Sequence, residues 1–161
     1  MIKYTEELMK ISLNINSETR TVIIKPSDTL LTVLRDKIGL TGAKAGCENA
    51  DCGACTVLID NQPMKSCIKL AVECIGKEIT TIEGLKNTEI QESFIEEGGF
   101  QCGFCTSGFL VNAYALLEED PEADEAKTKE WLQSNLCRCT GYEGIKNAVN
   151  SAKEKIKTRN V

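Results

Sequence analysis

The chain has 161 residues, a formal net charge of −5, nine cysteines and no histidine. The acidic balance argues against a nucleic-acid partner, and no stretch approaches the ~20 apolar residues of a membrane span. The absence of histidine excludes Rieske-type clusters, mixed Cys–His zinc fingers and histidine-based catalysis.

The first twenty residues contain no apolar signal segment, because Lys3, Glu6, Glu7 and Lys10 interrupt every short hydrophobic run. We therefore expect a cytoplasmic protein without membrane insertion. In that reducing compartment, nine cysteines indicate metal binding more than disulfide formation.

The first half of the chain predicts a sheet, because alternating or β-branched runs are separated by turn residues, as at 17–19. The expected strands are 10–16, 21–24, 56–59, 64–67 and 78–82. A short helix is expected over 30–34, with Ser27 or Asp28 as its N-cap and Gly39 at its end. A hairpin, a crossing helix and further strands are the element order of a β-grasp ferredoxin, which we place at residues 1–84.

Four cysteines of this half follow the spacing C-x4-C-x2-C…C, the plant-type ligand set of a [2Fe–2S] cluster. They are Cys47, Cys52, Cys55 and Cys67. Gly46 and Gly53 would let backbone N–H groups turn toward the sulfurs without Cβ clashes. A structural zinc site with four cysteine ligands is the alternative, because zinc sites also use C-x2-C spacing.

The second half, residues 85–161, has helical spacing throughout. The expected helices are 88–97, 108–118, 124–132 and 143–157. The first should bury Ile90, Phe94 and Ile95 on one side, and the second is apolar almost all round and should be buried. The charged runs 118–120 and 153–157 are expected to be solvated surface. Together the halves predict an α+β chain whose second domain is a four-helix bundle.

A second set of four cysteines lies in this helical half. They are Cys102, Cys105, Cys137 and Cys139. Both pairs are expected in loops at helix ends, where a bundle can bring them together and a helix N-terminus favours thiolates. The C-x-C pair is uncommon in zinc sites and favours a second iron–sulfur cluster. The remaining Cys74 is expected to be a small buried hydrophobic residue.

The motifs together are those of one family. They are the segments 46–47, 51–57, 66–67, 80–84, 101–106 and 135–142. From about residue 10 to 155 the chain resembles the small iron–sulfur subunit of molybdenum hydroxylases, the xanthine dehydrogenase and aldehyde oxidoreductase family. It departs from the family at Ser107, where proline is usual and where serine is expected to cap the following helix. Cys74 also lies outside the family pattern.

The resemblance implies an outer [2Fe–2S] cluster on the first cysteine set and an inner one on the second. It also implies that Cys139 is the inner ligand nearest the molybdopterin cofactor of a large partner subunit, and that Gln101 hydrogen-bonds the pterin edge. Electrons would pass through both clusters to FAD on a medium partner subunit or to an external acceptor, with no catalytic residue in this chain.

Several alternatives stay open at this stage. The complex could oxidise a purine or related heterocycle, which is our first expectation, an aldehyde, which is our second, a nicotinate-like heterocycle or carbon monoxide. The chain could instead be a free-standing two-cluster ferredoxin, or a zinc-stabilised interaction module. Metal content separates the zinc alternative from the others, and co-purification separates a subunit from a free ferredoxin.

Overall fold

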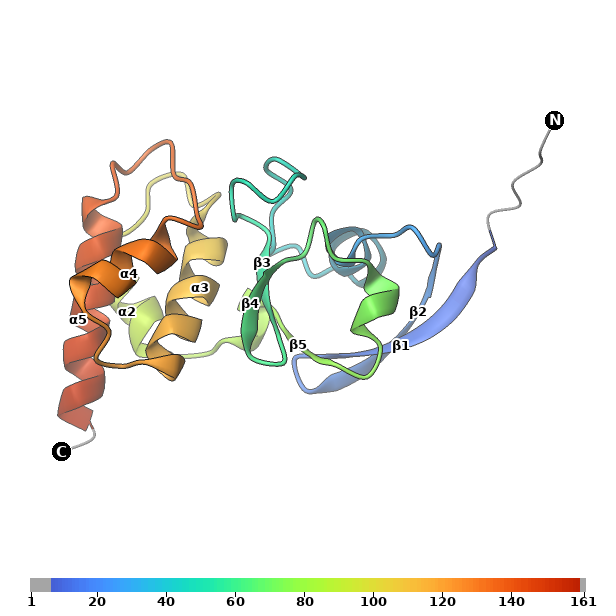
Figure 1. The fold of residues 1–161 in the computed structure, drawn as a ribbon, viewed down its shortest axis with the longest axis horizontal. Coiled ribbons are helices and arrows are strands. Elements are labelled where there is room, and N and C mark those ends of the chain that lie inside the picture. Colours follow the sequence, from blue (N-terminus) through green and yellow to red (C-terminus); the bar gives the residue numbers. More distant parts are fainter. Residues whose placement is uncertain (1–6, 160–161) are drawn as a thin grey trace.

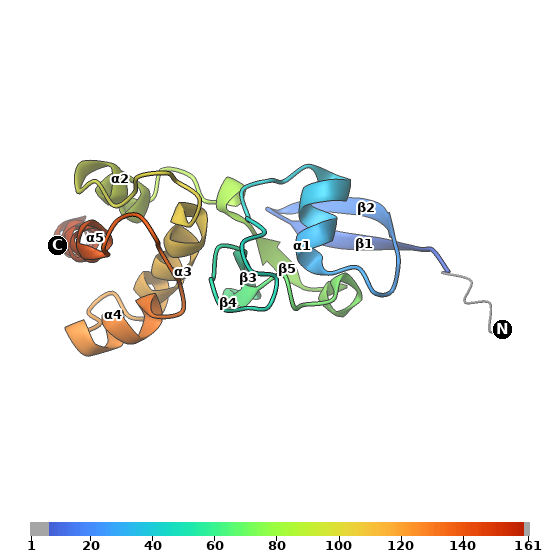
Figure 2. The same cartoon turned by 90° about the horizontal axis from the view of Figure 1, so that it is seen from above.

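The computed structural model describes residues 7–159 and has an α+β fold, with a sheet half followed by a helical half (Figures 1 and 2). The five strands are β1 (Met9–Ile15), β2 (Glu18–Ile24), β3 (Thr56–Ile59), β4 (Gln62–Lys65) and β5 (Glu78–Thr80). Their order is β2-β1-β5-β3-β4, with β1 and β5 parallel and the other neighbours antiparallel. This sheet confirms the predicted β-grasp arrangement.

The β1–β2 hairpin is tighter than predicted. Asn16 and Ser17 form a two-residue turn with left-handed φ values of 53° and 66°. Glu18 therefore pairs with Ile15 and already belongs to β2, so the expected turn over 17–19 is wrong. The left-handed pair matches the twist of the flanking strands, as in type I′ hairpins.

The helix that crosses the sheet begins as α1 (Leu30–Thr32) and continues as π-helical turns over Val33–Ile38 (Figure 2). Gly39 ends it in the left-handed conformation, with a φ of 86°, as predicted. The chain then enters the loop that carries the first three cysteines.

The N-cap of this helix is Thr29, so the prediction of Ser27 or Asp28 is wrong. The Thr29 hydroxyl accepts the Thr32 backbone N–H at 3.2 Å. Asp28 does not cap the helix because its carboxylate accepts the Lys25 backbone N–H at 2.9 Å instead. Ser27, Asp28 and Thr29 are all residue types that can cap a helix, so residue type alone does not determine which of them takes the cap position.

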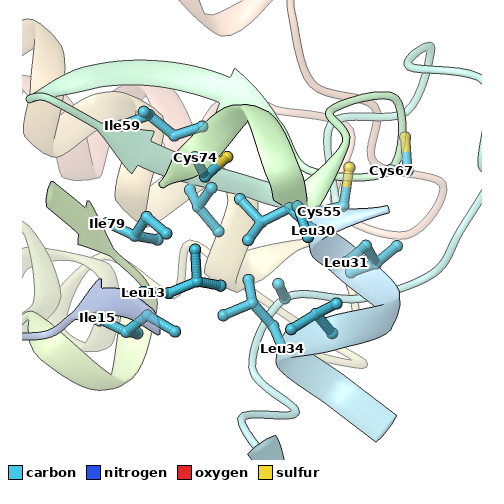
Figure 3. Packing of buried hydrophobic residues seen from close by; sticks show 14 of the residues in the cluster. Leu13, Ile15, Leu30, Leu31, Leu34, Cys55, Ile59, Cys67, Cys74 and Ile79 are labelled. Atoms are coloured by element: carbon cyan, nitrogen blue, oxygen red, sulfur yellow. The ribbon is translucent and has the colours of Figure 1, made fainter. Parts of the chain in front are cut away.

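The core of the sheet half lies between the sheet and this helix. Figure 3 shows Leu13, Ile15, Leu30, Leu34, Ile59 and Ile79 packed together. Cys74 lies in the same cluster with no exposed surface, and its thiol approaches the Leu70 carbonyl at 3.6 Å. Cys74 is therefore a buried hydrophobic residue, as predicted. Cys55 and Cys67 belong to the same cluster but lie near each other and away from Cys74 (Figure 3).

The helices of the second half are α2 (Glu89–Glu96), α3 (Thr106–Glu119), α4 (Glu125–Leu132) and α5 (Glu143–Arg159). The described helices lack the combination of length and apolarity needed to cross a bilayer. Helix α3 is central, as its apolar surface predicts. Phe109 packs toward α2 and α5, and Val111 packs on the other side against Leu58 of β3.

Three expectations for the helical half are wrong. Ile95 is 71% exposed, because the buried stripe of α2 follows Ile90 and Phe94 and leaves the next position pointing outward. Ser107 does not cap α3, because Cys105 occupies the N-cap position. Lys153 is not surface, since it is buried on the inner stripe of α5 between Val149 and Ile156.

Candidate metal centres

The first cysteine set lies on a tight loop between the crossing helix and β3, with Cys67 beyond β4. The Cys47 sulfur accepts the Cys52 backbone N–H at 3.3 Å. Glu48 and Ala50 have left-handed φ values of 57° and 71°, which turn the loop back on itself. A Cβ at Gly46 would lie 2.7 Å from Cys52 Sγ, so this close approach requires glycine.

Cys67 comes from a separate segment and is held beside Cys55. The Ser66 hydroxyl and backbone N–H both donate to the Cys55 carbonyl, at 2.7 Å and 3.3 Å. Burial, together with hydrogen bonding to Cys55, raises the pKa of the Cys67 thiol to about 11. In contrast, backbone N–H groups, first that of Cys52, lower the pKa of Cys47 to about 7. The set therefore combines partly exposed and buried cysteines, and the backbone N–H groups at Cys47 favour negative charge on its sulfur.

The second set joins the loop before α3 to the loop between α4 and α5. The Sγ atoms of Cys102 and Cys139 lie 3.6 Å apart. Burial and then hydrogen bonding to Cys137 raise the pKa of Cys105 to about 12. Each cysteine of the C-x2-C motif thus meets one cysteine of the C-x-C motif, which confirms that the bundle brings the two loops together.

Within residues 7–159, no three Cys, Asp or Glu side chains converge on one position suited to a single metal ion. The sulfurs meet in pairs instead, as with Cys102 and Cys139. A [2Fe–2S] cluster takes two ligands at each of its two irons. The thiol donors and their paired placement therefore fit a binuclear cluster.

The loop between α4 and α5 is braced around Cys137. The sulfur of Cys137 accepts the Thr140 hydroxyl at 3.1 Å and the Thr140 backbone N–H at 3.4 Å. Although burial opposes it, hydrogen bonding from Thr140 lowers the pKa of Cys137. The Cys137 backbone N–H donates to the Tyr142 hydroxyl at 2.9 Å, and Tyr142 itself has a left-handed φ of 72°.

One edge of the second set is open to the surface. Cys102, Cys139 and Gln101 are exposed. Large apolar side chains nearby in the sequence are also exposed, by 42% at Phe100, 48% at Phe104 and 54% at Leu136. An apolar exposed rim around ligand-type side chains is typical of a surface that another protein covers.

The two cysteine loops are joined by hydrogen bonds that sequence reasoning missed. The Leu136 backbone N–H donates to the Cys52 carbonyl at 2.9 Å, and the Asn135 side chain donates to the Gly53 carbonyl at 2.9 Å. Lys65 adds a bond of 2.8 Å to the Ser134 carbonyl. The position of Asn135 next to the C-x-C motif was visible in the sequence, but its partner 82 residues away was not.

Comparison with known proteins matches both halves. Residues 13–77 match the 2Fe-2S iron-sulfur cluster binding domain, and residues 81–150 match the [2Fe-2S] binding domain. The chain is 42% identical over 155 residues to the nicotine 6-hydroxylase small subunit of Paenarthrobacter nicotinovorans, covering 94% of each chain. It is 40% identical over 149 residues to the nicotinate dehydrogenase small FeS subunit of Eubacterium barkeri, covering 90% of this chain and 95% of that relative.

The fold also matches a solved structure. The crystal structure of quinoline 2-oxidoreductase from Pseudomonas putida 86 contains a chain with a TM-score of 0.88 and 42% identity, covering 96% of this chain and 99% of that one. Domain order, identity and coverage agree along nearly the whole length. The chain therefore belongs to the small iron–sulfur subunits of molybdenum hydroxylases, which serve electron transfer and not catalysis in larger oxidoreductase complexes.

Proposed function

We propose that each of the two cysteine sets holds one [2Fe–2S] cluster, within domains at residues 1–84 and 85–161. The outer ligands are Cys47, Cys52, Cys55 and Cys67, and the inner ligands are Cys102, Cys105, Cys137 and Cys139. The observation that carries this assignment is the pairing of Cys102 with Cys139 at 3.6 Å across two loops. The clusters, when bound, each accept and release one electron at a time.

The inner set faces the large molybdopterin-binding partner in this proposal. Its support is the exposed edge formed by Cys102 and Cys139, with the exposed Gln101 beside it. Cys139 is then the ligand nearest the pterin, and Gln101 donates a hydrogen bond to the pterin edge. Electrons travel from the inner to the outer set, and the bonds from Leu136 and Asn135 to the outer loop hold the two sets at a fixed spacing.

The final electron acceptor lies beyond the outer set. We assign it to FAD on a medium partner subunit, in a complex located in the cytoplasm. Support comes from the cysteine-rich outer loop, where Cys47 and Cys52 are each partly exposed and can bring a cluster near a second partner.

The substrate of the complex is a nitrogen heterocycle in this proposal. The names of the three relatives described above contain nicotine, nicotinate and quinoline, and each of these compounds has an aromatic ring with a nitrogen atom. The purified complex is expected to turn over such a ring faster than an aldehyde. A complex that oxidises aldehydes and rejects every heterocycle supplied would contradict this assignment.

The test of the ligand assignment is spectroscopic. The intact complex should contain about four iron and four acid-labile sulfide per small subunit, as two [2Fe–2S] clusters require. Cys139→Ser should diminish one electron paramagnetic resonance (EPR) signal, and Cys67→Ser should diminish the other. A colourless, zinc-loaded chain would refute both assignments. A fully iron-loaded chain that purifies without a large partner would favour a free ferredoxin.

A further inference from the structure

The hydroxyl of Thr140 points at a sulfur of the inner set. Its oxygen lies 3.1 Å from Cys137 Sγ, in a half-buried position directly after the C-x-C motif. The same oxygen accepts the Tyr142 backbone N–H at 3.3 Å. Because one lone pair of the hydroxyl is taken by that N–H, its own proton is directed to the sulfur, and such chains of hydrogen bonds strengthen one another.

The loop geometry fixes this contact. Gly141 and Tyr142 both have left-handed φ values, 66° and 72°, so the chain reverses immediately after Thr140. The Tyr142 hydroxyl then accepts the Cys137 backbone N–H at 2.9 Å, and its ring packs edge-on against Phe109 at 6.3 Å. Thr140 is therefore held between Cys137 and Tyr142, which are hydrogen-bonded to each other, and has little freedom to turn its hydroxyl away from the sulfur.

Among the hydrogen bonds described above, no hydroxyl group donates to a sulfur of the outer set. Its Cys47 sulfur receives the backbone N–H of Cys52, at 3.3 Å. The inner set thus has a side-chain donor that a single substitution removes, while the outer set has a backbone donor that survives substitution. Any effect of the Thr140 hydroxyl should be confined to one set.

We propose that Thr140 is a positioning residue that raises the reduction potential of the inner cluster by donating its hydroxyl hydrogen bond to Cys137 Sγ. This rests on the proposed function, in which Cys137 is an inner ligand. Adding one electron makes the cluster and its ligand sulfurs more negative, so a donor to the sulfur stabilises the reduced form, and hydrogen bonds to sulfur are known determinants of cluster potential. No bond is made or broken, because the couple transfers one electron to the cluster and nothing else.

The experiment is a redox titration of the intact complex, followed by the EPR signals of the two clusters. Thr140→Val removes the hydroxyl and keeps the side-chain shape and the backbone N–H, whereas Thr140→Ser keeps the hydroxyl. At a fixed applied potential, Thr140→Val should lower the ratio of reduced to oxidised inner cluster by about threefold to tenfold, tenfold being 59 mV for one electron. Thr140→Ser should stay near the wild-type midpoint, and the outer midpoint should not change in either variant.

An unchanged inner midpoint in Thr140→Val overturns the proposal, and so does an equal shift of both midpoints. If Thr140→Val loads no inner cluster, Thr140→Ser compared with Thr140→Ala gives the same decision, and equal midpoints in that pair overturn it. Cys137→Ser separates this proposal from the proposed function. If Cys137→Ser leaves both clusters intact, the ligand assignment itself fails, whatever the Thr140 variants do.

Discussion

The side-chain amide of Asn135 donates a hydrogen bond of 2.9 Å to the backbone carbonyl of Gly53, 82 residues earlier in the chain. Asn135 is 1% exposed, and Gly53 lies between two outer-set cysteines. A Cβ on Gly53 would lie 2.4 Å from the Asn135 amide nitrogen. The contact therefore requires glycine at position 53 and, at position 135, a side-chain amide long enough to reach the Gly53 carbonyl. The outer cysteine loop therefore packs directly against the segment that leads into Cys137 of the inner set.

Asn135→Ala is expected to destabilise this junction. The Gly53 carbonyl keeps the Thr56 hydroxyl and backbone N–H, at 2.7 Å and 3.1 Å, so one of its three hydrogen bonds is lost. The Asn135 side-chain oxygen also accepts the Ser134 hydroxyl at 2.9 Å, so the loss of these two hydrogen bonds and some packing should lower the free energy of unfolding by about 1–3 kcal/mol. Urea denaturation followed by visible cluster absorbance measures it. Asn147→Ala, at an exposed position of α5, is the control, and an equal effect there would contradict the role of Asn135.

Gly108→Ala should be more damaging, although it changes one methyl group. A Cβ at Gly108 would lie 2.2 Å from the Gly53 carbonyl oxygen and 2.9 Å from the Asn135 amide nitrogen. Because the nearest atom is backbone, α3 must move away from the outer loop, at a cost of about 3 kcal/mol. Thermal unfolding and outer-cluster content should both fall.

Ser107→Ala is the matched control for that variant on the same turn of α3. The Ser107 hydroxyl is buried and has no hydrogen-bond partner within residues 7–159. Removing an unsatisfied hydroxyl should leave the stability unchanged or raise it by about 1 kcal/mol. If Gly108→Ala and Ser107→Ala behave alike, the close approach of α3 to Gly53 does not limit stability.

Lys153 should make stability depend on alkaline pH. It is 7% exposed, and its ammonium donates to the Ala123 carbonyl at 2.7 Å and to the Thr128 hydroxyl at 2.5 Å. Burial, followed by the neighbouring Lys157, lowers its pKa below the usual 10.5. The folded chain then releases this proton at a lower pH than the unfolded chain, so the stability contributed by Lys153 rises between the lowered pKa and 10.5.

The measurement is the free energy of unfolding of the wild type and of Lys153→Met from pH 8 to pH 10.5. The wild type should gain stability relative to Lys153→Met as pH rises. Lys155→Met is the control: the Glu96 carboxylate at 2.7 Å raises the pKa of Lys155 above 10.5, so its contribution is lost only above that pH and should stay nearly constant across this range. Parallel curves for wild type and Lys153→Met would contradict the expectation.

Local patterns in the sequence predicted most of this structure. Apolar spacing located the helices, and motif spacing grouped the cysteines, because both depend on residues near one another in the chain. The failures involve choices among close neighbours or distant partners. Thr29 caps α1 although Asp28 is equally suited by type. Lys153 is buried because the Ala123 carbonyl before α4 and the Thr128 hydroxyl on α4 supply acceptors that the sequence does not place beside it. The bond from Asn135 to Gly53 joins both cysteine loops and has no local signal.

Cys74→Ala should leave the iron content of the complex unchanged while lowering stability. Cys74 has no exposed surface and belongs to the core of the sheet half, where Figure 3 shows its sulfur away from those of Cys55 and Cys67. Burial raises its pKa, so the thiol stays protonated at neutral pH and is a poor nucleophile. Removing its sulfur leaves a small cavity that should cost about 1–2 kcal/mol.

Iron and sulfide analysis, together with thermal unfolding, measures both effects, with Cys67→Ala as the comparison. Cys67→Ala should lose the outer cluster, and a matching iron loss in Cys74→Ala would make Cys74 a ligand.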